Sequence, residues 1–408
     1  MEYANMSNMN HSPYEGWRDW LAQLADQPKM QTLVAQTGAE EGWWSDESIW
    51  QQEYGRFTPH DQPSATLLYE TAEPPQKLCL IECFVEQPTI TSHQTRRYHP
   101  DLGWLRFTRF PHDPTLPGLQ TVLQMPGQAH VVRYRPHKRC TIRFTHPENG
   151  RIIFAKLFTD NRGAQIHTES IQLWEAAKAN LLDFQVAPPI RWDEPTHTLW
   201  QGFVPGKPVL PTLKSKDGPQ LAKRMGTAVA STTTSPLSPT ITFTRQDQMK
   251  RTQKYIRKLS QHLPNLAPAL NHLCHLLQSW HDTLPQRPLR PIHGAPHAHQ
   301  WLQTPNQLGL VDFDRLAWGE PELDVATFIT EIDFEDWSRF PGAAVNRHFI
   351  QGYETIAGPL DKQILALYCA HKRLAKALKA AYAIRPYGDL QAERHLGRAL
   401  TLAASLDF

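Results

Sequence analysis

The sequence lacks long apolar runs and carries almost no net charge. No window approaches the roughly 18 consecutive apolar residues that a membrane-spanning helix needs, and the longest apolar stretch, residues 78–85, predicts only a buried strand. The 42 Lys and Arg residues nearly balance the 40 Asp and Glu residues, which leaves a net charge of +2. Nucleic-acid-binding domains that work by bulk charge carry a strong basic excess. We therefore expect neither a membrane nor a nucleic acid as a partner.

Cysteine is also scarce. The 5 cysteines are scattered and odd in number, and the two closest, Cys79 and Cys83, have a spacing that matches no zinc knuckle. The first residues show no basic segment followed by an apolar one, so no secretory signal peptide is predicted. Scattered cysteines without a signal peptide are typical of a reduced, cytoplasmic protein.

The 408 residues exceed an average domain, so one large two-lobed domain or two domains are expected. Over residues 14–37 apolar residues recur at three- and four-residue spacing, which predicts a helix. Residues 78–85 and 103–110 predict strands, whereas residues 38–75 give no clear pattern. We therefore expect an N-terminal α+β extension over residues 1–128.

Residues 129–206 predict a small antiparallel sheet that carries one helix. Three short strands come first, and a turn at 146–150 joins the last two as a hairpin. A helix is predicted over 165–182, and two further strands end at the breaker pair Pro205-Gly206. The three first strands are 129–136, 140–146 and 150–158. The predicted apolar face of the helix holds Ile171, Trp174, Ala177 and Leu181.

Helical patterns dominate residues 207–408, which predicts a mainly helical second lobe. One segment, 290–321, has short apolar runs between polar turns and predicts short strands and loops. The expected fold class is therefore α+β, with a small antiparallel-sheet lobe, a larger helical lobe and the N-terminal extension. The predicted helices cover residues 218–232, 246–262, 266–282, 322–335, 343–355, 361–384 and 390–406.

Two segments of the helical part carry an ordered set of polar residues, one around residue 295 and one after residue 311. Together they resemble the catalytic core of the aminoglycoside phosphotransferase and choline kinase family, relatives of protein kinases. In that family His-Gly-Asp is followed by Asn or Gln, then by a strand ending in an Asp-centred triplet, then by Gly-x-Pro-x-x-Asp. The resemblance implies a protein-kinase-like, two-lobed fold. The matching positions are His293, Gly294, Gln300, Asp312, Gly319, Pro321 and Asp324.

The upstream sequence agrees with this resemblance, which covers about residues 129–400. Lys156, on the strand 150–158, stands where the family places its phosphate-binding lysine. Glu169, on the following helix, stands where the family places the ion-pair partner of that lysine. The segment 202–209 looks like the hinge between the lobes.

The resemblance implies transfer of a phosphoryl group from ATP to a hydroxyl of a small molecule. Phosphoryl transfer depends on positioning and charge neutralisation more than on covalent chemistry. By this likeness Lys156 binds phosphates, Glu169 orients Lys156, and Asp312 with Gln300 holds Mg²⁺ through oxygen ligands. The sequence has neither G-x-G-x-x-G nor a Walker A motif, and members of this family often do without a glycine-rich loop.

The main departure from the family pattern is Ala295, which stands where the family has its catalytic base, an Asp. A methyl group neither accepts a proton nor orients a hydroxyl, and general-base help is typically worth roughly 10²–10⁴ in rate. Either His297 or His299 replaces the base, since histidine titrates near neutrality, or Ala295 inactivates the transfer. Nucleotide binding does not depend on the base.

Several of these residues have plainer interpretations. Lys156 could be a solvated strand lysine, and Asp314 could be a second metal ligand or a loop carboxylate. Glu169 has a rival in Glu175 on the same predicted helix. The basic segment 133–143 lies either near the phosphates or at a solvated strand edge.

The histidines near the motif also have structural interpretations. In the family the counterpart of His293 braces the catalytic loop, and Asp324 caps a helix or binds that loop. Zinc on His293, His297 and His299 is a further possibility, but their spacing fits no zinc-enzyme signature.

Two functions follow as hypotheses. The first is an ATP- and Mg²⁺-dependent phosphotransferase acting on a small hydroxyl compound. The second is a catalytically inactive pseudokinase that binds nucleotide or a protein partner, which Ala295 favours. The sequence does not identify the acceptor, and residues 1–128 either recognise a protein partner or complete the small lobe.

Overall fold

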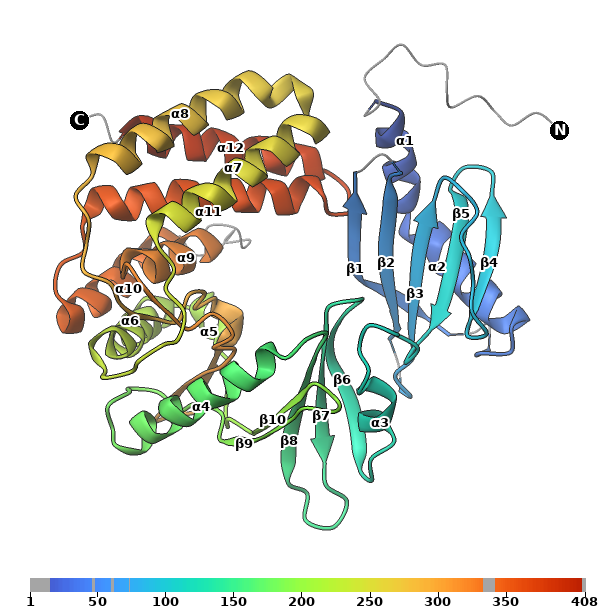
Figure 1. The fold of residues 1–408 in the computed structure, drawn as a ribbon, viewed down its shortest axis with the longest axis horizontal. Helices are drawn as coiled ribbons and strands as arrows, with labels where there is room; N and C mark the ends of the chain where they lie inside the picture. Colours follow the sequence, from blue (N-terminus) through green and yellow to red (C-terminus); the bar gives the residue numbers. More distant parts are fainter. Residues whose placement is uncertain (1–14, 46–47, 60–61, 73, 333–341, 406–408) are drawn as a thin grey trace.

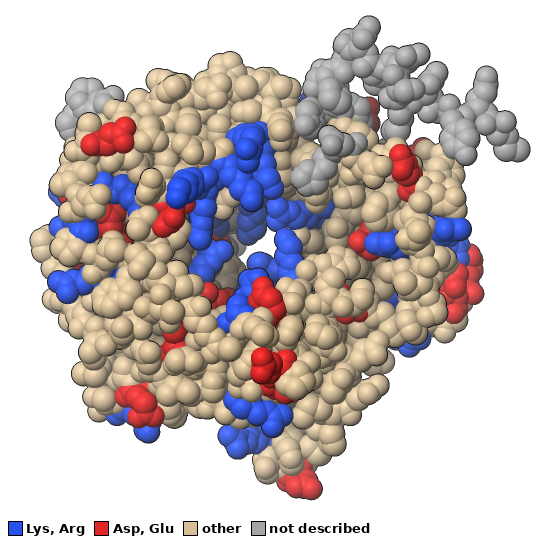
Figure 2. Space-filling model, viewed as in Figure 1, with Lys and Arg blue, Asp and Glu red and all other residues tan. Residues whose placement is uncertain are grey.

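The structure is a computed structural model that describes residues 15–45, 48–59, 62–72, 74–332 and 342–405. Three parts of the chain surround a central opening, which the space-filling view preserves (Figures 1 and 2). In the described ranges, no helix is long and apolar enough to cross a bilayer.

The N-terminal part is a five-stranded antiparallel sheet of order β1-β2-β3-β5-β4, with two helices on one face (Figure 1). The segment 38–75, which gave no clear pattern, contains β1 and β2. The single helix expected over 14–37 is two helices, because Asp26 caps a new helix by accepting a hydrogen bond from the Lys29 backbone N–H. The elements are α1 (Glu15–Leu24), α2 (Gln27–Glu40), β1 (Trp50–Thr58), β2 (Ser64–Thr71), β3 (Leu78–Phe84), β4 (Gln94–His99) and β5 (Gly103–Arg109).

A second five-stranded antiparallel sheet has the order β6-β7-β8-β10-β9 and carries helix α4. This confirms the predicted strands and hairpin. The predicted apolar face of the helix is wrong: Ile171 and Leu181 are 44% and 46% exposed. The face that is buried includes the polar Glu169 and Ser170, which a hydrophobic pattern does not count. The elements are α3 (Leu119–Leu123), β6 (Gln128–Arg135), β7 (Arg139–Thr145), β8 (Ile152–Phe158), α4 (Arg162–Lys178), β9 (Pro189–Asp193) and β10 (Thr198–Gly202).

The remaining chain is mainly helical, as predicted, with bounds close to the expected ones; the ends of two predicted helices, residues 333–335 and 406, lie outside the described residues. Helices α6 and α10 cross closely at Gly226. A Cβ at this position would lie only 2.0 Å from the Phe349 carbonyl oxygen, so the absence of a side chain permits the close crossing. The helices are α5 (Leu210–Leu213), α6 (Gly218–Thr234), α7 (Arg245–His262), α8 (Ala267–Thr283), α9 (Glu322–Ile332), α10 (Gly342–Ala357), α11 (Lys362–Ala381) and α12 (Gly388–Ala404). Short 3₁₀ turns span Pro264–Leu266 and Ala298–Gln300.

Short strands in the helical part place the motif residues. They are β11 (Lys207–Pro208), β12 (Arg290–Ile292), β13 (Trp301–Gln303), β14 (Leu308–Leu310) and β15 (Ala317–Gly319). Strand β12 pairs with β15, and β13 pairs with both β14 and β11. The predicted hinge 202–209 therefore leaves the second sheet at β10 and joins the helical part at β11.

The N-terminal sheet contacts both other parts of the molecule. On β1, the Phe57 backbone N–H donates to the Tyr382 carbonyl oxygen (2.9 Å) at the end of α11. On β3, Glu82 lies 3.3 Å from Nε2 of His137, in the turn between β6 and β7. The division of the chain at residues 128 and 206 stays a prediction; the second sheet begins with β6 at Gln128 and ends with β10 at Gly202.

Candidate active site

The loop after β12 is fixed by a buried carboxylate. Asp324, in the first turn of α9, accepts hydrogen bonds from the backbone N–H groups of His293 (2.7 Å) and Gly294 (2.8 Å). Gly294 has a φ of +81°, and a Cβ there would lie 2.3 Å from the Arg315 carbonyl oxygen, so only glycine fits. Burial raises the pKa of Asp324 to about 7.

His293 braces the same loop from the other side. It is fully buried, its Nε2 donates to the Val311 carbonyl oxygen (3.3 Å) and its Nδ1 accepts from the Ala295 backbone N–H (3.3 Å). Its ring lies 4.3 Å from the ring of Phe313. Burial lowers the pKa of His293 to about 4, so the ring is neutral at pH 7. His293 therefore has a structural position between the loop and the segment that carries Asp312.

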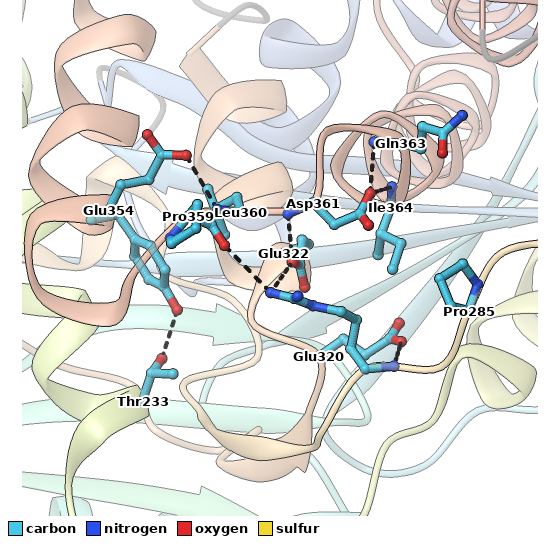
Figure 3. A network of polar contacts seen from close by, with 12 residues as sticks. Thr233, Pro285, Glu320, Glu322, Glu354, Pro359, Leu360, Asp361, Gln363 and Ile364 are labelled. Carbon is cyan, nitrogen blue, oxygen red and sulfur yellow. Dashed lines mark hydrogen bonds and ion pairs between the residues drawn. The ribbon is translucent and has the colours of Figure 1, made fainter.

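The start of α9 is itself anchored by a polar network (Figure 3). Glu322 is buried and accepts from the Asp361 backbone N–H (3.0 Å), and it also forms an ion pair with Arg287 (3.2 Å). Glu320 pairs with Arg245 (2.5 Å). These contacts fix the helix whose first turn carries Asp324, so the sequence Gly-Glu-Pro-Glu-Leu-Asp acts here as a structural unit.

Four charged side chains from β7, β8 and the segment after β14 meet at the centre of the site. Nζ of Lys156, on β8, lies 2.5 Å from Oδ1 of Asp312, which follows β14, and also forms an ion pair with Asp314. Arg139, on β7, donates to Oδ2 of Asp314 at 3.0 Å. Asp312 has a φ of 70°, an uncommon conformation outside glycine that often marks functional positions. The structure thus joins the predicted Lys156 and Asp312.

The pKa values of the two carboxylates in this cluster are shifted in opposite directions. Burial alone would raise the pKa of Asp312, but the charges of Lys156 and Arg139 outweigh it and hold that pKa well below its usual range. Burial and the charge on Asp312 raise the pKa of Asp314, although Lys156 opposes this shift. Two cations facing two carboxylates make the cluster nearly neutral.

Glu169 does not lie where the sequence placed it relative to Lys156. Its Oε1 accepts from the Gln165 side chain (3.0 Å) and from the Thr240 backbone N–H (3.1 Å). Within the described ranges, no ion pair joins it to Lys156, which binds Asp312 and Asp314 instead. Through the contact with Thr240, Glu169 holds the loop before α7 against α4.

Gln300 is close to Asp312 but its oxygen is occupied. Oε1 of Gln300 accepts from the His297 backbone N–H (2.9 Å), and its Nε2 donates to Oδ2 of Asp312 (3.2 Å). As arranged, Gln300 holds the Asp312 carboxylate. Its predicted role as a metal ligand requires the amide to turn over and give up both hydrogen bonds.

His297 faces α9 and α11. Its Nδ1 lies 3.6 Å from Oε2 of Glu331, which also forms an ion pair with Lys376. Burial and the charges of Lys376 and Lys372 lower the pKa of His297 to about 3. A base works best with a pKa near the working pH, so this environment speaks against His297 as the substitute base, a role that stays a prediction.

The residues present fit Mg²⁺ held together with phosphate oxygens. Mg²⁺ is usually bound by one or two carboxylates plus substrate phosphates, and Asp312 and Asp314 supply two carboxylates on a single turn. In the part of the chain that the structure describes, no three His, Cys, Asp or Glu side chains gather as a metal site, which gives no support to zinc on the three motif histidines.

Arg139 is the site residue that the sequence did not single out. The signal was the basic segment 133–143, for which proximity to phosphates was one of two interpretations. The structure brings Arg139 to the carboxylates because β7 pairs with β8, with Arg139 opposite Phe158 and two residues from the Thr141–Lys156 pair. The cluster of basic residues in the segment 133–143 therefore indicated the right region. Only the register between β7 and β8 shows that Arg139 is the residue that reaches the carboxylates.

The comparisons with known proteins agree with this geometry. The sequence profile of the Phosphotransferase enzyme family matches residues 154–362, half of the chain, and the chain therefore belongs to this family. This confirms the family resemblance. Among curated proteins, no sequence matches the chain.

Solved structures share the α+β kinase-like fold. A choline/ethanolamine kinase family protein from Mesorhizobium loti is 17% identical, with a TM-score of 0.51, over 71% of this chain and 97% of that one. A candidate aminoglycoside phosphotransferase from Ralstonia eutropha is 16% identical, with a TM-score of 0.52, over 71% and 98%. A GDP complex of an aminoglycoside 2′-phosphotransferase is 15% identical, with a TM-score of 0.48, over 72% of this chain and 98% of that one. At these identities the likeness shows the fold, as predicted, and leaves the substrate open.

Proposed function

We propose that the chain is a phosphotransferase that transfers a phosphoryl group from a Mg²⁺-bound nucleoside triphosphate, expected to be ATP, to a small molecule. The observation that carries the proposal is the meeting of Lys156 with Asp312 and Asp314, from two parts of the molecule, at one point. A lysine and two carboxylates at one point match what a metal–polyphosphate ligand requires.

Each residue of the cluster has a separate task in this proposal. Lys156 and Arg139 bind phosphate oxygens, so both leave the carboxylates when the nucleotide enters. Asp312 and Asp314 would hold Mg²⁺, which would supply positive charge against the phosphate groups. Gln300 positions Asp312 through its amide N–H. His293 and Asp324 keep the loop in place and touch no reacting atom.

A pseudokinase is the second candidate, and Ala295 favours it. Ala295 is 5% exposed and stands where the family resemblance implies the base. Without a base, transfer to a neutral hydroxyl, the acceptor expected from the sequence, loses roughly 10²–10⁴ in rate. A protein that binds nucleotide without turnover would match this second candidate.

The test is a thermal-shift titration of the full chain with ATP and Mg²⁺, combined with an assay for ADP release. A ligand that binds only the folded state raises its stability, so we expect a shift that needs both ATP and Mg²⁺. Lys156→Met should abolish the shift. Lys178→Met is the matched control, because Lys178 is an exposed lysine on α4 that pairs with the exposed Glu175. No shift with the wild-type chain would refute nucleotide binding, and a shift without ADP release for any acceptor would favour the pseudokinase.

A further inference from the structure

Lys and Arg side chains gather around the central opening of the molecule (Figure 2). They come from all three parts of the chain, and we name them the basic ring. The opening lies beside α7, β1 and the β6–β7 hairpin (Figure 1). With a net charge of only +2 over the whole chain, this local excess is not a consequence of composition. The basic ring consists of Arg56, Arg133, Arg135, Lys138, Arg139, Arg251, Lys254, Lys258 and Arg315.

One side of the basic ring is a helical stripe. Arg251, Lys254 and Lys258 follow one another on α7 at spacings of three and four residues, which places them on one helix face. Arg251 is held in place over the ring of Phe243, with its guanidinium carbon 4.2 Å from the ring centroid. Lys258 lines a small cavity together with Arg56 of the N-terminal sheet.

The small lobe supplies the other side. Burial and the charges of Arg56, Arg135 and Lys258 lower the pKa of Lys138, so these four cations lie within electrostatic range of one another. The basic ring continues through Arg135, whose neighbours include Arg133 and Arg139. It therefore runs from β1 and α7 to the Lys156 cluster.

Arg315 brings the basic ring to the catalytic loop. Arg315 packs directly against Gly294, with its carbonyl oxygen and Cβ 2.3 and 2.8 Å from where a Cβ of Gly294 would lie, so its side chain begins beside the residue that precedes Ala295. Arg315 is exposed, and its charge reaches Arg251 and the half-buried Lys372. The acceptor of a phosphotransferase must reach this loop, and here it meets positive charge.

We propose that the acceptor is a small anionic molecule whose attacking atom is a phosphate or carboxylate oxygen, bound by Arg315 and Arg251 of the basic ring. This deepens the proposed function and rests on it. Such an oxygen is already deprotonated at neutral pH, so it needs no catalytic base, and Ala295 costs the reaction nothing. The cationic side chains offset its repulsion from the nucleotide phosphates.

The transfer balances without any proton transfer. A bond forms between the γ-phosphorus and the acceptor oxygen, and the bond from that phosphorus to the oxygen bridging to the β-phosphorus breaks. The bonding electron pair leaves with the nucleoside diphosphate. The product is a diphosphate when the acceptor is a phosphate ester, and an acyl phosphate when it is a carboxylate. A small ligand is favoured over a nucleic acid because the basic side chains surround a central opening (Figure 2).

Matched acceptors test this proposal. The purified protein, supplied with Mg²⁺ and ATP, would be incubated with one acceptor at a time, and mass spectrometry would identify the products. The matched pairs are glycerol with glycerol 3-phosphate and ribose with ribose 5-phosphate; acetate, choline and kanamycin complete the panel. We expect a phosphate- or carboxylate-bearing member to be phosphorylated. The double variant Arg251→Gln/Arg315→Gln should raise its KM at least about tenfold, and kcat should change less. The nucleotide-induced thermal shift should stay as in the wild type, with Lys178→Gln as the control.

Contrary outcomes are equally distinct. Faster turnover of glycerol, ribose, choline or kanamycin than of the phosphate- and carboxylate-bearing compounds would overturn the proposal of an anionic acceptor. If no compound is turned over, glycerol 3-phosphate must still stabilise protein saturated with a non-hydrolysable nucleotide, and the double variant must not respond; no response at millimolar concentration overturns the proposal. Tight oligonucleotide binding that falls steeply with salt would assign the basic ring to nucleic acid and also overturn it. Loss of the nucleotide shift itself would refute the proposed function instead.

Discussion

Nζ of Lys156 lies 2.5 Å from Oδ1 of Asp312, and this ion pair joins the second sheet to the helical part of the chain. The same amine also pairs with Asp314. Lys156 therefore neutralises the carboxylates that we assign to Mg²⁺. In the proposed function, Asp312 and Asp314 would hold Mg²⁺ and Lys156 would hold phosphate in place of these contacts.

Removing this amine should therefore affect stability as well as binding. In Lys156→Met, two largely buried carboxylates lose their main cation, and breaking such a pair costs about 3–5 kcal/mol in the free energy of unfolding. Mg²⁺ alone should recover part of the loss and stabilise the variant more than the wild type. Urea denaturation with and without Mg²⁺ measures both effects. Equal Mg²⁺ responses in the two proteins would contradict the assignment of Asp312 and Asp314.

Restoring a carboxylate at position 295 separates two kinds of acceptor. Ala295→Asp should raise turnover of hydroxyl acceptors by up to about 10²–10⁴, because it supplies the group that takes their proton. It should slow transfer to an anionic acceptor, because it adds a like charge. Steady-state rates with glycerol and glycerol 3-phosphate, beside the neutral control Ala295→Asn, measure this. Unchanged rates with both acceptors would mean that position 295 does not face the acceptor.

The loop contact of Asp324 gives a prediction about stability. An ionised carboxylate accepts both backbone N–H groups, whereas Asn has one acceptor oxygen. Asp324→Asn should therefore leave one buried donor unsatisfied and cost about 1–3 kcal/mol in the free energy of unfolding. Chemical denaturation measures this, and a variant as stable as the wild type would show that one of the two hydrogen bonds is dispensable.

The contact between the N-terminal sheet and the β6–β7 turn should depend on pH. Hydrogen bonds to Asp113 and Glu82 raise the pKa of His137 from 6.5 to about 9. Because the folded-state pKa is the higher one, the stabilisation is fully present below pH 6.5 and is lost as the pH rises through about 9. Urea denaturation of the wild type and His137→Gln should show a stability difference that shrinks over this window. A difference independent of pH would contradict the charged contact.

Much of the fold could be predicted from local sequence patterns. Strand β8 and helices α6 to α8 have a clear periodicity, and the order of the motif residues from His293 to Asp324 indicated the family. The buried face of α4 could not be predicted in this way, because Glu169 and Ser170 are buried by hydrogen bonding. Strands β1 and β2, within the segment 38–75 that has no clear pattern, are held by pairing inside the N-terminal sheet, which a local pattern does not reveal.

The amino-acid sequence by itself determined which reactive side chains are present, in which order, and on which helices, strands and turns they lie. The periodicity of helices and strands and the turn at Gly294 depend on residues that are close in the sequence. Only the tertiary structure decided their partners. It gave Lys156 to Asp312 and Asp314 in place of Glu169, and it brought Arg56, Arg251 and Arg315 to one opening. The ion pairs of Lys156 join residues more than 150 positions apart. Charges interact through space, and the sequence alone gives no distance between them.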